Sequence, residues 1–316
     1  MISFLKSAPF FLALFLTSCG KKEEPISDEP AQGADLVKEF SGDRAFAHVQ
    51  ALTDLGPRPP ESDGYRKSLT YLEKELSALG WKTKRQDFKD ETPIGPVNFT
   101  NLLARYTSGA NVDWETSVPF VLGSHLDTKR YISITFLGAN DSGSSTGVLV
   151  EMANVLPKNP TLAQQVELVF FDGEEAMLTN IDPKKDGLYG SRFYASELTK
   201  RKSQPQFGMV LDLVGDTNVP LLIGADSDDR LKRHAINAAM KLNLGNTTQV
   251  ARYPIIDDHL PLITKANLKT LHLIGDFNRM PYWHTQDDTI ANISPVALSN
   301  SGKLALQVIT QLTKSH

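Results

Sequence analysis

The sequence predicts an α/β fold: a single domain of three layers, α/β/α, around a mixed and mostly parallel central sheet. Two observations lead to this fold class. Short apolar runs rich in Val, Leu, Ile and Phe alternate along the chain with longer segments of helical periodicity, and no internal repeat or second linker interrupts the pattern. Near-continuous apolar strands are typical of a sheet that helices cover on both faces, with largely parallel strands.

The elements follow in order from about Leu36. Residues 44–55 and 64–80 have helical spacing; the second of these places a stripe of leucines on one face and ends at Gly80. Further helices are predicted at residues 145–156, 188–199, 228–243 and 299–313. Apolar strands are predicted at residues 117–125, 166–172, 207–215, 220–224 and 268–275.

Composition and charge limit the classes of function. The chain has 316 residues, of which 41% are hydrophobic and 22% charged, so it can bury a full globular core. The formal net charge is −4, and no basic stretch is long enough to attract a nucleic acid. We expect no nucleic-acid partner, and we expect a monomer.

The first 18 residues have the features of an export signal. Lys6 is followed by an apolar stretch that is too short to span a bilayer as a mature helix. The stretch ends in Leu-Thr-Ser-Cys, which resembles a bacterial lipoprotein signal, and Cys19 is the only cysteine in the chain. We expect cleavage before Cys19 and its lipidation; an ordinary signal with an incidental cysteine is the alternative.

These features divide the chain into three parts. Residues 1–18 are the predicted lipoprotein signal peptide, residues 19–35 a flexible tether, and residues 36–316 the α/β domain that carries the site. The tether is polar and poor in large apolar groups, as flexible linkers are. We expect an exported protein with a lipid anchor, on the periplasmic face of the inner membrane or on the outer membrane.

Polar side chains gather where the predicted strands end. The strand at 166–172 runs into Asp172, Glu174 and Glu175, and such close carboxylates repel each other unless a positive group compensates them. Ligands bind beyond the carboxyl ends of strands in such a sheet, so we expect these groups to converge. Further candidates at strand ends or in nearby turns are His125, Asp127, Asp141, Asp212, Asp257, Asp258, His259, His272, Trp283 and His284.

Histidine with carboxylate is the ligand set of a hydrolytic type of zinc site, and a divalent cation would offset the clustered negative charge. Adjacent residues at the end of a strand point in different directions. One of Glu174 and Glu175 can therefore bind metal while its neighbour faces the substrate as a proton carrier.

The order of these motifs resembles the zinc-dependent M28 exopeptidase family over residues 43–313: His-x-Asp, Asn-Asp-Ser, Asp-Gly-Glu-Glu, Leu-Asp-Leu and a late Trp-His. Within that family the chain is similar to glutaminyl cyclases (glutaminyl-peptide cyclotransferases). The stretches that carry this likeness are FFDGEEA, LYGSRFYA, VLDLVG, DDHLPLI, LHLIG and YWHTQDD. The resemblance implies a zinc exopeptidase-like fold.

The resemblance also implies roles for individual residues. A single catalytic Zn²⁺ would be held by Asp141, Glu175 and His284, and Glu174 would be the general acid/base. Asp212 and Asp257 match carboxylates of the family's proton network. Trp283 matches the aromatic wall of the substrate pocket, and His272 and His259 match pocket-side positions. His125 and Asp212 are the candidate ligands of a second zinc.

The implied reaction closes the N-terminal glutamine of a peptide or protein to pyroglutamate and releases ammonia. Zinc would polarise the side-chain amide carbonyl while the peptide's own α-amine attacks. Glu174 would accept a proton from that amine and deliver it to the departing ammonia. Because the attack is intramolecular, it depends on orientation in a snug apolar pocket.

One position departs from the family pattern. Cyclases of the animal type have a tryptophan five residues after the metal-binding glutamate, where this chain has Asn180. Purely structural roles also stay open: His259 and His272 as histidines of the core, and Asp127 and Asp258 as turn or cap residues. We interpret the pair Asp287-Asp288 as turn or cap residues.

Two other functions remain as alternatives. His125, Asp141, Glu175, Asp212 and His284 together match the five protein ligands of two-zinc aminopeptidases, so one zinc is expected and two are the alternative. In such an aminopeptidase Glu174 would activate a water that hydrolyses the N-terminal peptide bond. A non-catalytic binding domain is the third hypothesis, but binding domains derived from enzymes typically lose metal ligands, and none is lost here.

Overall fold

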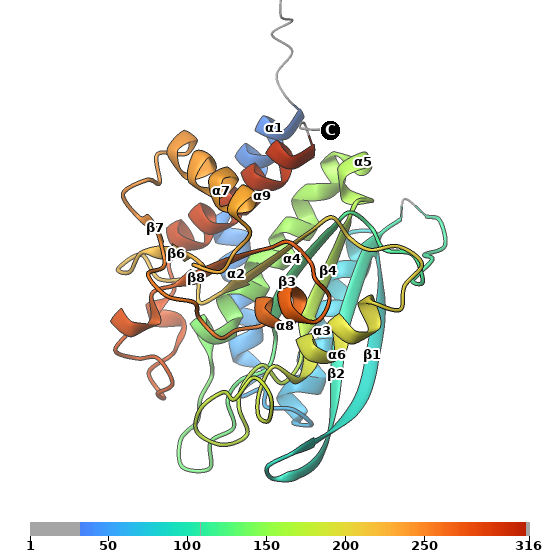
Figure 1. Cartoon of the computed structure of the whole chain (residues 1–316). Coiled ribbons are helices and arrows are strands. Elements are labelled where there is room, and N and C mark those ends of the chain that lie inside the picture. Colours follow the sequence, from blue (N-terminus) through green and yellow to red (C-terminus); the bar gives the residue numbers. More distant parts are fainter. Residues whose placement is uncertain (1–31, 108, 314–316) are drawn as a thin grey trace, which may run out of the picture. The chain divides into compact units, whose positions relative to one another are not determined.

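The structure, a computed structural model, describes residues 32–107 and 109–313, which form one mixed sheet of eight strands with helices on both faces (Figure 1). The order across the sheet is β1-β2-β4-β3-β5-β8-β6-β7. The strands are β1 (Trp81–Thr92), β2 (Gly95–Tyr106), β3 (Phe120–His125), β4 (Val166–Phe171), β5 (Phe207–Asp212), β6 (Leu221–Ile223), β7 (Thr248–Val250) and β8 (Thr270–Gly275).

The centre of the sheet is parallel. Strands β4, β3, β5 and β8 run side by side in one direction, whereas β2 joins β4, and β6 joins β8, in antiparallel pairs. The predicted fold class, a mostly parallel mixed sheet between helices, is therefore confirmed. Parallel neighbours end at the same edge of a sheet, so the carboxyl ends of these four strands lie together.

The sequence did not indicate three of the strands. The hairpin of β1 and β2 forms one edge of the sheet, and β1 carries alternating exposed and half-buried residues, among them seven charged ones. A strand with one solvent-exposed face and many charged residues lacks the apolar run that indicates a buried strand. The other missed strand, β7, has only three residues.

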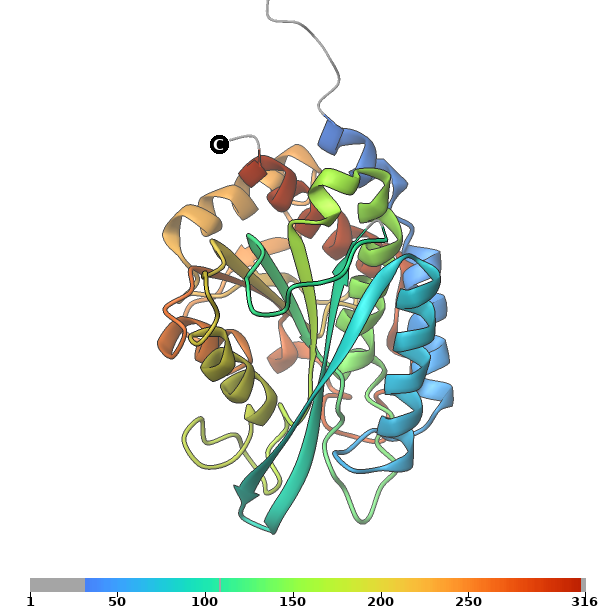
Figure 2. The ribbon, with the colours of Figure 1, turned by 90° about the vertical axis from the view of Figure 1, so that its right-hand side faces the viewer.

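Helices cover the sheet on both faces, as the view in Figure 2 shows. Helices α1 to α4, α7 and α9 pack on one face, and α6 and α8 pack on the other. The helices are α1 (Gln32–Glu39), α2 (Gly42–Asp54), α3 (Asp63–Ala78), α4 (Ser145–Val155), α5 (Pro160–Ala163), α6 (Tyr189–Leu198), α7 (Asp229–Lys241), α8 (His259–Thr264) and α9 (Pro295–Thr313).

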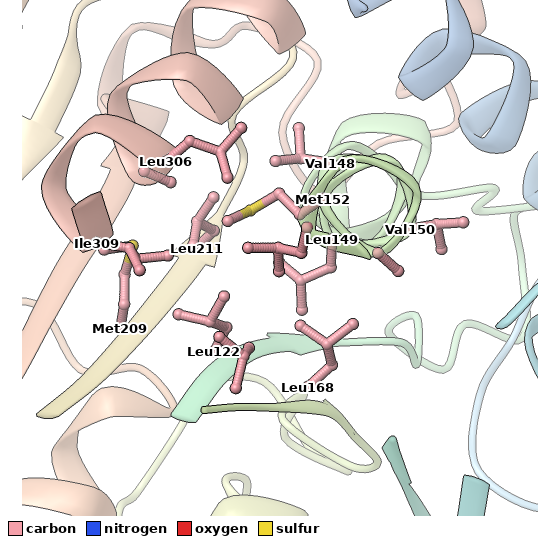
Figure 3. Packing of buried hydrophobic residues seen from close by; sticks show 14 of the residues in the cluster. Leu122, Val148, Leu149, Val150, Met152, Leu168, Met209, Leu211, Leu306 and Ile309 are labelled. Atoms are coloured by element: carbon pink, nitrogen blue, oxygen red, sulfur yellow. The ribbon is translucent and has the colours of Figure 1, made fainter. Parts of the chain in front are cut away.

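Alternate residues of the central strands enter two separate cores. Val121, Val169 and Val210 pack against α6 and α8. Their neighbours Leu122, Leu168, Met209 and Leu211 face the other side, where Figure 3 shows them beneath residues of α4 and α9 such as Leu149, Met152, Leu306 and Ile309. A side-chain period of two on a strand that is buried on both faces explains why its apolar run is continuous.

Two predictions concern the N-terminal part. Helix α1 begins at Gln32, within the range 19–35 for which the sequence predicts a tether, while the signal peptide and Cys19 lie outside the described residues. Among the residues that the structure does describe, no helix is long and apolar enough to cross a membrane.

Candidate metal and catalytic site

The predicted site residues meet at the carboxyl edge of the parallel strands. His125 and Asp212 are the last residues of β3 and β5, and Glu174 and Glu175 follow β4. A cavity of about 640 Å³ opens at this edge. Its lining includes Asp141, Glu174, Glu175, Asp212, Asp257, Trp283 and His284.

Three side chains offer ligand atoms around one point. The Nε2 atom of His284 lies 3.3 Å from Oδ2 of Asp141 and 3.1 Å from Oε1 of Glu175. The three ligand atoms lie within 4.8 Å of one another, so Asp141, Glu175 and His284 could hold one metal ion. We call such a set of candidate metal ligands a donor group. One imidazole and two carboxylates that line an open cavity fit a catalytic zinc, which has three protein ligands and one open position.

A second donor group adjoins the first and shares Asp141 with it. The Nε2 atom of His125 lies 3.2 Å from Oδ1 of Asp141 and 3.2 Å from Oδ1 of Asp212. The two oxygens of Asp141 therefore face different histidines, and His125, Asp141 and Asp212 also form a group that could hold a metal. His125 is buried with an exposed fraction of 1%.

Behind the cavity lies a buried cluster of two histidines. The rings of His259 and His272 stack with centroids 3.9 Å apart. Nε2 of His272 lies 2.6 Å from Oδ2 of Asp257, and Nε2 of His259 lies 3.1 Å from Asp226. The sequence places both histidines on the wall of the substrate pocket; in the structure both are fully buried, and Asp257 is the cavity-lining residue that His272 contacts.

The backbone at the two glutamates is held by Asp127. Its Oδ1 accepts the backbone N–H of Glu174 at 3.1 Å and its Oδ2 accepts that of Glu175 at 3.3 Å. Asp127 is fully buried. Asp127 therefore does not cap its own turn, as the structural interpretation expected, but binds the backbone that follows β4, 47 and 48 positions away in sequence.

Asp288 holds the backbone at Asp141, the other carboxylate among the candidate metal ligands, in the same manner. Its carboxylate accepts the backbone N–H of Asn140 at 2.8 Å and that of Asp141 at 3.1 Å. Asp288 is fully buried, whereas its neighbour Asp287 is exposed. Since His284 is only four positions away, one short segment supplies a candidate ligand and the support for a second one.

Sequence reasoning missed Arg58. Its guanidinium is fully buried and donates to the carbonyl oxygens of Leu126, Leu137 and Gly138, at 2.9, 2.8 and 2.9 Å. These carbonyls lie at the two ends of the loop that connects β3 to the turn of Asp141. An arginine between prolines in GPRPPES is visible in the sequence, but no local pattern there indicates that its guanidinium is buried, since arginines are mostly exposed.

Lys129 is a second residue that the sequence did not single out. It is buried, with Nζ 3.3 Å from Oε2 of Glu175 and 3.2 Å from the carbonyl oxygen of Ala176. Glu175 therefore has one oxygen toward His284 and the other toward Lys129. The ammonium compensates part of the negative charge that the sequence showed at this strand end.

Burial and nearby charges act on the pKa of Glu174. Burial raises the pKa of Glu174 well above its usual value; the charge of His125 opposes this, and the charges of Glu175 and Asp257 add to it. A carboxyl group that binds a proton this readily suits general acid/base catalysis. Burial likewise raises the pKa of Asp212 to about 7, although His125 opposes the shift.

The pKa of His284 is raised as well, but by neighbouring carboxylates rather than by burial. Burial by itself lowers the pKa of His284, but the charge of Glu175 and hydrogen bonds to Asp141 and Glu175 raise it to about 10. The site therefore attracts positive charge, here as protons on imidazoles. A metal ion that binds the same atoms would replace those protons.

An aromatic surface joins the donor group to the rest of the cavity. The indole of Trp283 stacks on His284 with centroids 4.1 Å apart, and its Nε1 donates to Oδ2 of Asp141 at 3.1 Å. Phe277 lies against the same indole at 4.8 Å. Asn180, at the position where animal cyclases have tryptophan, also lines the cavity and is exposed.

Comparisons with known proteins agree with this geometry. A curated relative, the glutaminyl-peptide cyclotransferase-like protein of Bos taurus, is 29% identical over 280 residues, which cover 78% of this chain and 70% of that protein. The solved structure of glutaminyl cyclase from an Acidobacteriales bacterium is 27% identical, with 94% of this chain and 100% of that chain covered and a TM-score of 0.75.

A further solved structure is described as a leucine aminopeptidase precursor from Bacteroides thetaiotaomicron. It is 25% identical, covers 87% of this chain and 98% of its own, and has a TM-score of 0.77. The model of Peptidase family M28 matches residues 101–309, more than half of the 316 residues. That range contains the whole donor group and its supports other than Arg58, and the chain therefore belongs to Peptidase family M28.

Proposed function

We propose that the protein is a zinc-dependent glutaminyl-peptide cyclotransferase, which converts the N-terminal glutamine of peptides or proteins to pyroglutamate and releases ammonia. The observation that carries the proposal is one group of three candidate ligands, Asp141, Glu175 and His284, that shares a cavity with Glu174, whose pKa is raised by burial. The choice of reaction within the family rests on the likeness to named cyclotransferases and cyclases.

The residues that line the cavity have different roles in this proposal. Asp141, Glu175 and His284 would hold Zn²⁺, which when bound supplies a Lewis acid for the carbonyl of the glutamine side chain. Trp283, fixed through its Nε1 to Asp141, offers a flat apolar surface for the methylene groups of that side chain. A bound substrate in this arrangement has its α-amine and side-chain amide in one cavity, and orientation of the two groups there favours intramolecular attack.

Glu174 moves the proton. As the α-amine forms its bond to the side-chain carbonyl carbon, the Glu174 carboxylate accepts the proton that the amine loses. The same proton then goes to the amide nitrogen, the bond from carbon to that nitrogen breaks, and ammonia leaves. A carboxyl group with a raised pKa is suited to both halves of this transfer. Asp212 and Asp257, which line the cavity near Glu174, are the proposed continuation of the proton network.

A direct test uses mass spectrometry of two peptides incubated with a chain that lacks residues 1–19 and keeps all of α1, one peptide with N-terminal Gln and one with N-terminal Leu. The proposal predicts loss of ammonia from the first and no change in the second. Release of free leucine from the second, with the first unchanged, would reject it.

Aminopeptidase activity is the second candidate, and one observation favours it: His125, Asp141 and Asp212 form a second donor group next to the first. Asp141 and Asp212 of this second group line the cavity, whereas His125 does not, and the likeness to named cyclotransferases and cyclases favours the first candidate. A count of bound zinc per chain separates the two: one ion for the cyclase, two for the aminopeptidase.

We also propose that the protein is an exported lipoprotein monomer. The lipobox-like Leu-Thr-Ser-Cys before residue 20 and the polar residues after it support a lipid anchor on Cys19. The domain would then act on peptides at a membrane surface, and the tether would connect the domain to the lipid on Cys19.

A further inference from the structure

The cavity is larger than a single N-terminal residue needs. Its volume of about 640 Å³ falls within the range of roughly 300–1,000 Å³ that holds whole drug-sized ligands. Consecutive Cα atoms of a peptide are about 3.8 Å apart, so a substrate with its first residue at the donor group must place its second residue in or at the rim of the same cavity.

One segment of the lining exposes apolar side chains. Val250, Tyr253 and Ile256 all line the cavity, with exposed fractions of 47%, 65% and 46%. A single exposed apolar residue is ordinary, but three within seven positions around one cavity form a patch, and such patches mark binding sites. Arg252 lies within this segment and also lines the cavity, with its guanidinium 5.2 Å from the ring centre of Tyr253. The segment is anchored at its start, where the backbone N–H of Ala251 donates to the carbonyl oxygen of Ile223 in β6.

The patch is continuous with the candidate catalytic site. Ile255, in the same segment, packs with Phe277 and Trp283 against one apolar cluster. Trp283 in turn stacks on His284. Apolar side chains therefore connect a candidate zinc ligand with the exposed residues at the rim, and the charged side chains of Arg252 and Asp276 line the cavity beside them.

We propose that residues 250–256, together with Phe277, bind the side chain of the second residue of the substrate and select for a large apolar or aromatic one. This specificity rests on the proposed cyclisation of N-terminal glutamine and names the substrates within that class. Burial of a half-exposed tyrosine and isoleucine against an aromatic second residue removes apolar surface from water on both partners, which stabilises the bound peptide.

The test compares two peptides that differ only at the second residue, Gln-Phe-Ala-Lys and Gln-Ser-Ala-Lys. For the wild type, kcat/KM for the Phe peptide is expected to exceed that for the Ser peptide by on the order of tenfold, mainly through a lower KM. In the double variant Tyr253→Ser/Ile256→Ser this ratio should fall toward one. The control Met240→Ser removes an equally exposed apolar side chain on α7, away from the cavity, and should keep the wild-type ratio.

Two results would overturn the specificity: a wild-type ratio near one, or a double variant that keeps the wild-type ratio. If wild type cyclises neither peptide, the proposed function fails, and the binding surface is then judged by isothermal titration calorimetry with the same peptides. Tighter binding of the Phe peptide that is lost in the double variant supports the surface without the reaction. Equal affinity for both peptides rejects the surface as well.

Discussion

The carboxylate of Asp127 accepts the backbone N–H of Glu174 at 3.1 Å, across 47 positions of sequence. Its second oxygen accepts the N–H of Glu175. One buried side chain at the end of β3 thus sets the direction of the backbone from which both glutamates extend. Both glutamates line the cavity, Glu175 in contact with His284, and the positions of both depend on this fixed turn.

Replacement of Asp127 by Ala should therefore misplace both glutamates. We expect kcat/KM for cyclisation of a Gln-peptide to fall about 10²-fold or more, since small displacements of catalytic groups have effects of this size. The matched control is Asp113→Ala, which removes an exposed carboxylate that accepts the backbone N–H of Glu115 far from the site. Equal activities of the two variants would contradict the role of Asp127.

Substitutions of the two glutamates should differ in their effect on the zinc content of the protein. Glu174→Gln removes the proton carrier and leaves the ligands, so zinc should stay bound while turnover falls by roughly 10²–10⁴-fold. Glu175→Gln removes an anionic ligand, so zinc should bind far more weakly and activity should be lost with it. Atomic absorption on dialysed protein measures the zinc content of each variant. Loss of zinc in Glu174→Gln and its retention in Glu175→Gln would mean that the two assigned roles are reversed.

The acidic pair at 287–288 contains its own control. Asp288→Asn can accept only one of the two backbone N–H groups, from Asn140 and Asp141, and the second is left buried without a partner. Since residues that support ligands typically change metal affinity or activity by about 10–100-fold, we expect a loss of this size in zinc affinity. Asp287→Asn changes an exposed neighbour and should match the wild type in a competition assay with a chelator. Equal zinc affinity of both variants would show that Asp288 does not support Asp141.

A stability prediction concerns the other end of β4. Glu167 is fully buried and pairs with Arg105 at 2.5 Å and Arg201 at 2.9 Å. Glu167→Gln leaves two buried guanidinium groups without a counter-charge, so the free energy of unfolding should fall by roughly 3–5 kcal/mol. Glu197→Gln, which breaks an exposed pair with Lys200, should lower it by less than about 1 kcal/mol. Urea unfolding of both variants measures the difference, and similar losses would refute the prediction.

Location can be tested at Cys19. If this cysteine carries the lipid, Cys19→Ala should release the protein into the exported soluble fraction or leave the signal uncleaved. Membrane fractionation and the size of the mature chain report the result. A variant that fractionates and is processed like the wild type would exclude the lipoprotein proposal.

Much of the fold follows from local patterns. The apolar runs at β3, β4, β5 and β8 and the periodic helices between them were readable because burial on both faces demands them, whatever the details of packing. Edge strands β1 and β7 could not be predicted in this way, because a strand with a solvent-exposed face can consist largely of polar residues. Its own residues also do not indicate which strand pairs with it.

The sequence by itself determined which chemistry the chain carries: carboxylates and histidines at strand ends, in the order shared with Peptidase family M28. Only the tertiary structure decided what each carboxylate touches. Asp127, Asp141, Glu175 and Asp288 are all acidic residues in turns, yet two of them meet His284 and the other two bind backbone N–H groups. The contact from Asp288 to Asp141 spans 147 positions, and no local pattern encodes a pairing that forms only when the sheet brings two distant turns to the same edge.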